Sequence, residues 1–391
     1  MTRLIITKET VKMRATTLIK ITIFLIKIAL LIYPSKASGI QEFIVSPSNQ
    51  EQQAPDIHNG LVVWQELVDG DWDIYAADIY DDQSSYVFSV AVFTDDQTNP
   101  AVFGDIVVWQ DYVETDWGIY GLDLFAPDNT FVVADYEYDQ TNPAIYGNIV
   151  TWQDNYYGDW DIYIADISDQ NAPVETLATP FEDDQQKPVI YQNTIAWEHA
   201  GGGDIDVYGT DITNTSDLQT FIIGGFDINQ QSPAIFGTTV VWADNFFADM
   251  DIFKADVQEP ARPIESVVSS ITAAQSNPDI DGHIIVWQDN RYGDWDIVAY
   301  NITTQKEFFI TNNSADQINP AISGNFVVFQ DNSSGIWNIH AAILDEPIAA
   351  ECLSIPAGDT NNDCKVDMTD FVAIAASWLQ CDLQPQTACW E

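Results

Sequence analysis

One sequence unit occurs seven times in this chain and constrains its fold more than any other feature. Each copy opens with Gln-x-x-Pro, and a large aromatic residue follows nine positions after the proline. A period in the forties, in units rich in β-branched residues, is typical of the blades of a β-propeller. We therefore expect an all-β, seven-bladed β-propeller over residues 41–345. The seven aromatic residues, at spacings of 45, 43, 45, 45, 45 and 42, are Trp64, Trp109, Trp152, Trp197, Trp242, Trp287 and Phe329.

The copy at 140–167, QTNPAIYGNIVTWQDNYYGDWDIYIADI, predicts four short strands per unit. A strand at Pro-x-Ile leads to a hairpin at Gly147, where glycine supplies the positive φ that a tight turn requires. The β-branched run 149–152 forms the second strand, and a hairpin at Gly158 leads into the third strand at 160–163. A fourth strand follows after a variable loop.

The seventh unit ends near Leu344 and has no fourth strand of its own. A phenylalanine stands twelve residues before the proline in five of the seven copies, and Phe43 is the first of them. The segment 42–45 around Phe43 should therefore complete the last blade. Such an N-terminal strand closes the ring and leaves no open sheet edge.

The third strand of most units carries one recurring polar residue. Because blades pack face to face, this residue should be partly buried, and a buried carboxylate is costly unless it is hydrogen-bonded. We expect each member of the set to accept hydrogen bonds within or between blades: Asp73, Asp161, Asp206, Asp251, Asp296 and Asn338.

Residues 1–37 have the features of a secretory signal peptide. Basic residues precede the apolar run 21–33, and Ser35-Lys36-Ala37 resembles a cleavage site. Lys27 keeps the run shorter than the ~20 apolar residues of a spanning helix, so a retained membrane anchor is the weaker alternative. We expect a secreted, extracellular or cell-surface protein with no membrane span after cleavage.

The chain is strongly acidic, with 13 Lys and Arg against 60 Asp and Glu and a net charge of −47. Residues 1–37 hold seven of the basic and one of the acidic residues, so the remainder has 6 against 59, a charge of −53. Such a surface repels nucleic acid and anionic lipid and attracts cations. The expected partner is an extracellular polysaccharide or a surface protein, with no nucleic acid.

The unit P-x-I-x-G-x-x-V-V-W-Q-D…G-D-W-D-I-Y-x-x-D resembles the TolB-like β-propeller repeats of exported and surface-associated proteins, over about residues 41–345. That family includes binding platforms, interaction scaffolds and a few enzymes, so the resemblance implies the fold more strongly than the function. The N-terminal domain of TolB itself has no counterpart here. Membership of the Tol envelope complex is therefore not implied.

No recognisable catalytic set interrupts the repeats, and catalytic residues remain unknown. His58, His199, His283 and His340 fall at different positions of different units, unlike the His-rich metal site of the propeller lyases that act on uronic-acid chains. With so many acidic residues, a pair at glycosidase spacing would arise by chance.

Aromatic residues in the variable hairpins are the candidate ligand-binding residues, since flat rings stack on sugars or fill pockets of a partner. Alternatively, some of these rings pack against neighbouring loops. The fourth unit is the most irregular, because Glu198-His199 followed by three glycines replaces the usual Gln-Asp-Asn; this is either a reshaped ligand-facing loop or a glycine-rich variation. The candidates are Tyr156, Tyr157, Glu198, His199, Phe246, Phe247 and Tyr292.

After a linker at 346–356, residues 357–391 change character. The stretch GDTNNDCKVDMTDF places six residues at positions 1, 3, 5, 7, 9 and 12 of an EF-hand-like loop: Asp359, Asn361, Asp363, Lys365 through its carbonyl, Asp367 and Asp370. Apolar residues at helical spacing from Phe371 to Leu379 predict one following helix. We expect a small α-helical module with Ca²⁺ as its cofactor.

The closing aspartate and the single helix resemble dockerin type I repeats, which implies a cohesin-like partner, although a standard dockerin has two such segments and this chain has one. All four cysteines lie in this region, and in an exported chain they predict two disulfides with three possible connectivities. Because two cysteines flank the helix, we favour Cys364 with Cys381 and Cys352 with Cys389.

The sequence thus favours an exported, non-enzymatic binding or scaffold protein with a carbohydrate or protein ligand and a calcium-binding tail for assembly or attachment. The alternative is an extracellular polysaccharide-degrading enzyme, a glycoside hydrolase or lyase, because dockerin-like tails often accompany such catalytic domains. A structural role in a surface layer is a third possibility.

Overall fold

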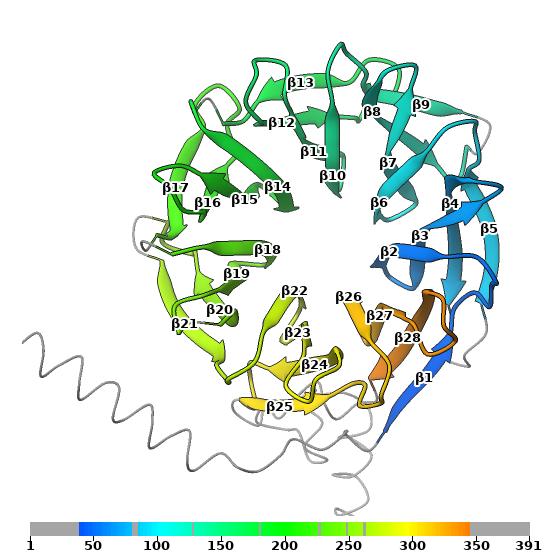
Figure 1. Cartoon of the computed structure of the whole chain (residues 1–391). Helices are drawn as coiled ribbons and strands as arrows, with labels where there is room; N and C mark the ends of the chain where they lie inside the picture. Colours follow the sequence, from blue (N-terminus) through cyan, green and yellow to red (C-terminus); the bar gives the residue numbers. More distant parts are fainter. Residues whose placement is uncertain are drawn as a thin grey trace, which may run out of the picture.

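The computed structural model describes residues 39–344, apart from 80–84, 127–128, 180, 226–227, 248 and 261–262. These residues form 28 strands and, within the part described, no helix. The strands make seven four-stranded sheets around a central opening (Figure 1). The expected all-β, seven-bladed propeller is therefore confirmed. The signal peptide, the linker and the calcium module with its cysteines lie outside the described residues.

In each blade the strands run from the central opening outwards. Blade one contains β2 (Gln52–His58), β3 (Leu61–Val68), β4 (Asp71–Ile79) and β5 (Ser85–Ala91). Blade two contains β6 (Gln97–Phe103), β7 (Ile106–Val113), β8 (Asp116–Asp123) and β9 (Thr130–Ala134). Blade three contains β10 (Gln140–Tyr146), β11 (Ile149–Asp154), β12 (Asp161–Asp166) and β13 (Val174–Leu177). Blade four contains β14 (Asp184–Tyr191), β15 (Thr194–Ala200), β16 (Asp206–Asp211) and β17 (Gln219–Gly224).

The remaining blades repeat this order. Blade five contains β18 (Gln230–Phe236), β19 (Thr239–Asp244), β20 (Asp251–Asp256) and β21 (Ile264–Ser269). Blade six contains β22 (Gln275–Asp281), β23 (Ile284–Asp289), β24 (Asp296–Asn301) and β25 (Lys306–Phe309). Blade seven contains β26 (Gln317–Ser323), β27 (Phe326–Asp331), β28 (Asn338–Leu344) and, on its outer edge, β1 (Ile40–Ile44).

The N-terminal strand closes the ring, as the sequence predicted. β1 runs antiparallel to β28, with its register fixed by pairs from Ile40 with Leu344 to Ile44 with His340. Figure 1 shows β1 alongside β28 at the outside of blade seven. Val45, directly after β1, is fully buried and its N–H bonds to the carbonyl of Ile339 at 2.9 Å. The two ends of the propeller therefore hold each other in one sheet.

The repeated aromatic residue of the second strand is the centre of the core. The six tryptophans and Phe329 are all fully buried, and each packs against a neighbouring blade. In blades one, two, five and six the indole Nε1 donates to the acidic side chain two residues later, as in Trp109 with Asp111 at 3.2 Å and Trp287 with Asp289 at 3.2 Å, whereas the Nε1 of Trp152 in blade three is buried without a hydrogen-bond partner. In blade four His199 takes the place of that acid, and the Nε1 of Trp197 is buried without a hydrogen-bond partner.

The inner strand begins three residues earlier than expected, at the glutamine of Gln-x-x-Pro, in six blades, and one residue earlier still, at Asp184, in blade four. All seven glutamines are completely buried. Gln97 Oε1 accepts the N–H of Phe93 at 3.1 Å, and Gln52 Oε1 accepts the N–H of Ile339 in blade seven at 3.0 Å. The glutamine therefore ties the start of the inner strand to the loop before it or to the third strand of the neighbouring blade, which its polarity alone did not reveal.

Among the described contacts, the recurring polar residue of the third strand accepts hydrogen bonds at Asp251, Asp296 and Asn338. Asp296 accepts from the hydroxyl of Thr311 and the N–H of Asn313, both at 3.3 Å. Asp73 and Asp161 each have one buried oxygen with no partner. The pKa of each of these two carboxyls is raised to about 6, mainly by burial and further by neighbouring acidic side chains.

No helix among the described strands and loops is long and apolar enough to cross a membrane.

Candidate functional site

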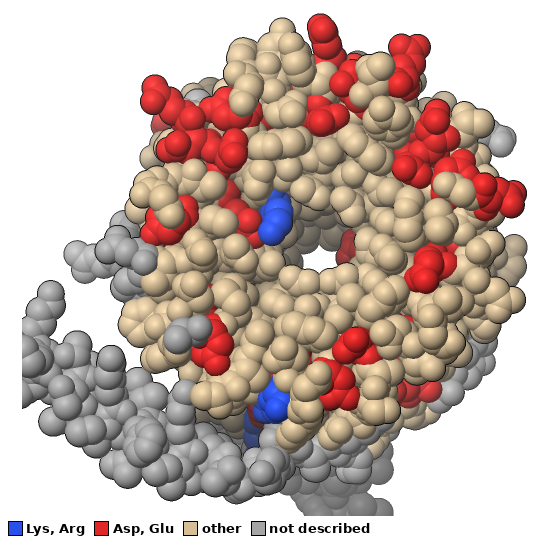
Figure 2. Space-filling model, viewed as in Figure 1, with Lys and Arg blue, Asp and Glu red and all other residues tan. Residues whose placement is uncertain are grey.

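The inner strands surround a channel along the propeller axis, and its two ends differ in chemistry. The end where these strands start carries a belt of polar side chains, and the end where they finish carries a cluster of rings. Figure 2 shows the opening from one face, with one basic side chain beside it and most acidic side chains farther out.

The polar belt is built on the residue that precedes the repeated proline. In all seven blades this residue has a left-handed backbone, with φ between 48° and 54°, and in four blades it is asparagine, which tolerates that conformation. The N–H of Asn142 donates to Gln110 Oε1 of blade two at 3.1 Å, and its amide donates to Gln153 of its own blade at 3.0 Å. Neighbouring blades are therefore joined by a repeated pair of amide side chains.

Blade four replaces both members of that pair with charged residues. Lys187 stands in place of the asparagine and Glu198 in place of the glutamine, with Nζ and Oε1 at 3.0 Å. The side chain of Glu198 is only 5% exposed, and it also accepts the N–H of Ser232 in blade five at 2.7 Å. The side chain of Lys187 is 51% exposed. Glu198 thus makes the same two contacts as the glutamine of the other belt pairs, one within its blade and one to the next blade. The exposed Lys187 places a positive charge at the opening.

Loss of one partner of this pair should cost more stability than replacement of both. Lys187→Asn leaves Glu198 almost buried without its cation and should lower the free energy of unfolding by about 1–2 kcal/mol. Lys187→Asn combined with Glu198→Gln recreates the amide pair of blades two, three, six and seven and should cost less than about 0.5 kcal/mol. Urea denaturation of the two single variants and the double variant measures the coupling. An equal loss in Lys187→Asn and the double variant would contradict it.

At the other end, the last residue of each inner strand lines the channel mouth. Five of the seven are aromatic and come from consecutive blades, with ring centroids 4.3, 4.5, 4.8 and 4.8 Å apart. We call them the aromatic arc: His58, Phe103, Tyr146, Tyr191 and Phe236. Asp281 and Ser323 complete the ring, and together these residues line a cavity of about 410 Å³.

Two carboxylates line the same cavity one layer deeper. Asp56 accepts the N–H of Val102 at 2.8 Å, and Asp279 accepts the N–H of Ile322 at 2.7 Å. Burial raises the pKa of Asp56 to about 6 and that of Asp279 to about 7, although these backbone hydrogen bonds oppose the shift. The charges of Asp56 and Asp281 raise the pKa of Asp279 further.

His58 links the arc to these acids. Its Nδ1 accepts the N–H of Gly104 at 2.9 Å, so the proton of the neutral ring lies on Nε2. Burial lowers the pKa of His58, against the opposing charges of Asp281 and Asp105. The mouth therefore combines neutral rings with acidic side chains.

The predicted hairpin tyrosines of blade three lie on the surface. Tyr156 is 51% and Tyr157 69% exposed, and their rings meet edge to face at 5.0 Å. Tyr138, from the loop before β10, is 48% exposed and meets Tyr156 edge to face at 5.8 Å. We call Tyr138, Tyr156 and Tyr157 the tyrosine cluster.

The sequence analysis did not select Tyr138 or its neighbour Tyr136, which is 50% exposed and whose hydroxyl donates to Glu175. Both stand in Asp-Tyr-Glu-Tyr-Asp, directly before the Gln-x-x-Pro of blade three. The sequence signal that could have identified them is this pair of tyrosines in the loop before β10. That loop lies at the same end of blade three as the hairpin that carries Tyr156 and Tyr157.

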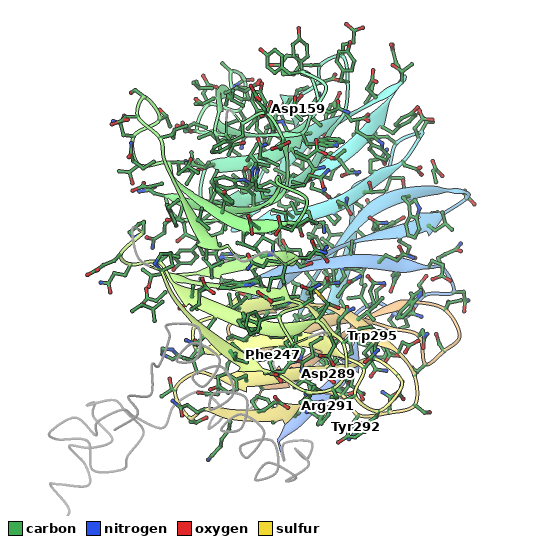
Figure 3. The ribbon with its side chains drawn as sticks, turned by 60° about the vertical axis from the view of Figure 1, so that its left-hand side comes forward. Asp159, Phe247, Asp289, Arg291, Tyr292 and Trp295 are labelled. Atoms are coloured by element: carbon green, nitrogen blue, oxygen red, sulfur yellow. The ribbon has the colours of Figure 1, made fainter. Side chains whose placement is uncertain are left out.

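The other predicted aromatic residues do not join the tyrosine cluster. Phe246 is 53% exposed, whereas Phe247 is half-buried and its ring stacks 6.2 Å from Phe253. Tyr292 is 46% exposed and stacks 5.6 Å from Phe309. Figure 3 shows Phe247 and Tyr292 on neighbouring blades, far from the blade-three hairpin that Asp159 marks.

Arg291 supports the hairpin of Tyr292. Its Nε donates to Asp289 at 2.8 Å and its NH1 donates to Glu307 at 2.6 Å, while the guanidinium lies 5.2 Å from the ring centre of Phe309. Figure 3 shows Asp289, Arg291 and Tyr292 together. Since the side chain of Arg291 is 12% exposed, this group holds the hairpin and offers little charge to a ligand.

Glu198 and His199 point to opposite faces of β15. Glu198 belongs to the polar belt, whereas His199 packs against Tyr208 at 4.8 Å and Phe181 at 5.5 Å. Burial lowers the pKa of His199, opposed by the charge of Asp183. The structure therefore does not bring these two residues to one surface, and a ligand at either stays a prediction.

Within the described residues, no group of three or more His, Cys, Asp or Glu side chains could hold a metal ion. The predicted calcium residues 359–370 lie outside that part of the chain.

Comparison with known proteins supports the fold alone. No protein-family model and no curated protein matches the sequence. Among solved structures, a puromycin-hydrolysing peptidase of Mycobacterium tuberculosis is 12% identical with a TM-score of 0.58, over 82% of this chain and 55% of that one. This chain therefore spans about half the length of that peptidase.

Two further structures are matched over nearly their whole length. An oligogalacturonate lyase in complex with manganese is 12% identical with a TM-score of 0.57, over 81% of this chain and 96% of that one. The β-propeller domain of the Trilobed protease of Pyrococcus furiosus, which has an open velcro topology, is 7% identical with a TM-score of 0.58, over 76% and 94%. Fold and comparisons together define a seven-bladed β-propeller, a class that includes both binding proteins and domains of enzymes.

Proposed function

We propose that this protein is an exported, non-enzymatic β-propeller that binds a neutral extracellular polysaccharide through the tyrosine cluster. The observation that supports this function is a group of three exposed rings on one rim, in which Tyr156 meets both Tyr138 and Tyr157 edge to face. Exposed aromatic residues that meet in a cluster offer flat apolar faces with a polar hydroxyl at the edge, which suits the faces and hydroxyl groups of sugars.

The charge around the cluster favours a neutral polymer. Asp154 accepts the N–H of Tyr156 at 2.8 Å. The hydrogen bond to Glu175 raises the pKa of Tyr136 and burial raises the pKa of Tyr163, and the charge of Asp154 adds to both shifts. Tyr138 itself stands between Glu137 and Asp139. A polyuronate would meet these carboxylates and the strongly negative protein as like charges, which is unfavourable.

The remaining parts of the chain complete the proposed role. Residues 1–37 direct export. In the tail, the side chains of Asp359, Asn361, Asp363, Asp367 and Asp370 and the carbonyl of Lys365 bind Ca²⁺, and the tail attaches the propeller to a cohesin-like partner or a surface. The propeller then presents the polysaccharide at the site of attachment.

Removal of the tyrosine cluster should abolish retention on the polymer. In the variant Tyr138→Ala, Tyr156→Ala, Tyr157→Ala we expect at least about a tenfold loss of affinity for whichever of cellulose, xylan or β-glucan retains the parent protein, because aromatic anchors supply most of such binding energy. Pull-down with the insoluble polymer measures it.

Tyr86 provides the matched control, since it is 68% exposed but lies on β5, at the outer edge of blade one. Tyr86→Ala should leave retention unchanged. Equal retention by the triple variant, or no retention of the parent protein on any neutral polymer, would refute the proposal.

A second candidate function is polysaccharide cleavage, and one observation favours it. Asp56 and Asp279 line one cavity with raised pKa values, and carboxyls of that kind occur at catalytic sites. An oligogalacturonate lyase also has a similar fold. The formation of new reducing ends distinguishes this function from binding.

A further inference from the structure

The channel mouth is a concave site at the end of the propeller where the inner strands finish, separate from the tyrosine cluster. We propose that it binds a small organic cation, an alkylammonium ion whose charged head lies among Asp56, Asp279 and Asp281 and whose carbon chain lies along the aromatic arc. The argument rests on the placement of the carboxylates, the size of the cavity and the chemistry of its wall.

The fold does not require carboxylates at these positions. Asp56 and Asp279 occupy the position after the repeated proline, where the other five blades have Ala101, Ala144, Val189, Ala234 and Ala321. Each accepts one N–H from the next blade, yet five blades are built without that contact. Asp56 and Asp279 are both half-buried, and the charge of one raises the pKa of the other. Their mutual repulsion destabilises the protein when no ligand is bound. A bound cation would relieve this repulsion.

The spacing of the acids fits a cation larger than a metal ion. Ca²⁺ draws six to eight oxygens to within about 2.6 Å, but no three acidic or histidine side chains among the described residues converge in that way. The cavity of about 410 Å³ has room for an alkyl chain as well as a charged head. A ligand of several carbon atoms with one positive charge therefore fits both observations.

The aromatic arc supplies the complementary wall. Five rings from blades one to five form a continuous aromatic rim, and rings attract nearby cations as well as burying carbon chains. The acids come from blades one and six, so the cavity has one aromatic side and one acidic side. In an alkylammonium ion the carbon chain matches the aromatic side of the cavity and the positive head matches the acidic side.

Calorimetric titration of the whole protein with hexylammonium chloride, in 150 mM salt at pH 8, tests the proposal. We expect saturable binding of one ion per chain. Hexan-1-ol, which has the same chain without the charge, should bind at least tenfold more weakly. The double variant Asp56→Asn, Asp279→Asn should lose at least tenfold in affinity, because both carboxylates beside the head become neutral.

Two acids of blade three, the half-buried Asp159 and the exposed Asp169, are the controls for the general negative charge. Asp159→Asn with Asp169→Asn removes the same number of charges away from the cavity and should change the affinity less than twofold. The thermal unfolding midpoint shows whether the channel variant is folded. Absence of binding, equal affinity for hexan-1-ol, or equal losses in the two double variants would overturn the proposal. If the channel variant unfolds, Phe103→Leu should still weaken binding of the ion, and unchanged affinity there would also overturn it.

Discussion

A chain that starts at residue 49 should unfold at a midpoint about 10 °C or more below that of a chain that starts at residue 38. The shorter chain lacks β1 and the fully buried Val45, and it leaves β28 as an exposed edge of blade seven. Loss of the buried side chains and of the strand pairing should lower the free energy of unfolding by about 5 kcal/mol. Differential scanning calorimetry measures the change.

The control for this deletion lies in the same strand. Ile44 is 44% exposed, so Ile44→Ser in the longer chain should change the free energy of unfolding by less than about 0.5 kcal/mol. An unchanged midpoint and a single sharp transition in the shorter chain would mean that β1 does not close the ring.

Truncation of one core tryptophan should also be severe. Trp287 is fully buried and packs with Val241 and Ile252 of blade five, so Trp287→Ala should lower the free energy of unfolding by about 4 kcal/mol. Urea denaturation measures this loss. A cost below about 1 kcal/mol would show that the contact between blades five and six contributes little.

The conservative change to phenylalanine separates packing from hydrogen bonding. Trp287→Phe removes the donor to Asp289 and should cost about 1 kcal/mol more than Trp197→Phe, whose indole N–H has no partner. The same cost at both positions would contradict the role assigned to the tryptophan–acid pair.

The sequence predicted the blade number and the closing strand because both depend on a repeated spacing. It missed the start of each inner strand because the buried glutamines bond to residues in other strands, such as Gln52 to Ile339, 287 positions away. A polar residue that is satisfied by so distant a partner has no local pattern to identify it.

The candidate site was predicted less completely. Phe246 and Phe247 are adjacent and chemically alike, but only Phe247 turns toward Phe253, and no local pattern separates them. Tyr138 was missed because its contact with Tyr156 joins two loops at the same end of the propeller. The aromatic arc was missed because its members are one per blade and become neighbours only when the ring closes.

The most direct test of the proposed function measures binding and cleavage together. Residues 38–391 are incubated with neutral and acidic polysaccharides, with calcium or with chelator, and retention, new reducing ends and unsaturated products are assayed. We predict retention on a neutral polymer, through the tyrosine cluster, with no new ends. Reproducible new ends would contradict the binding function and direct attention to Asp56 and Asp279 in the channel.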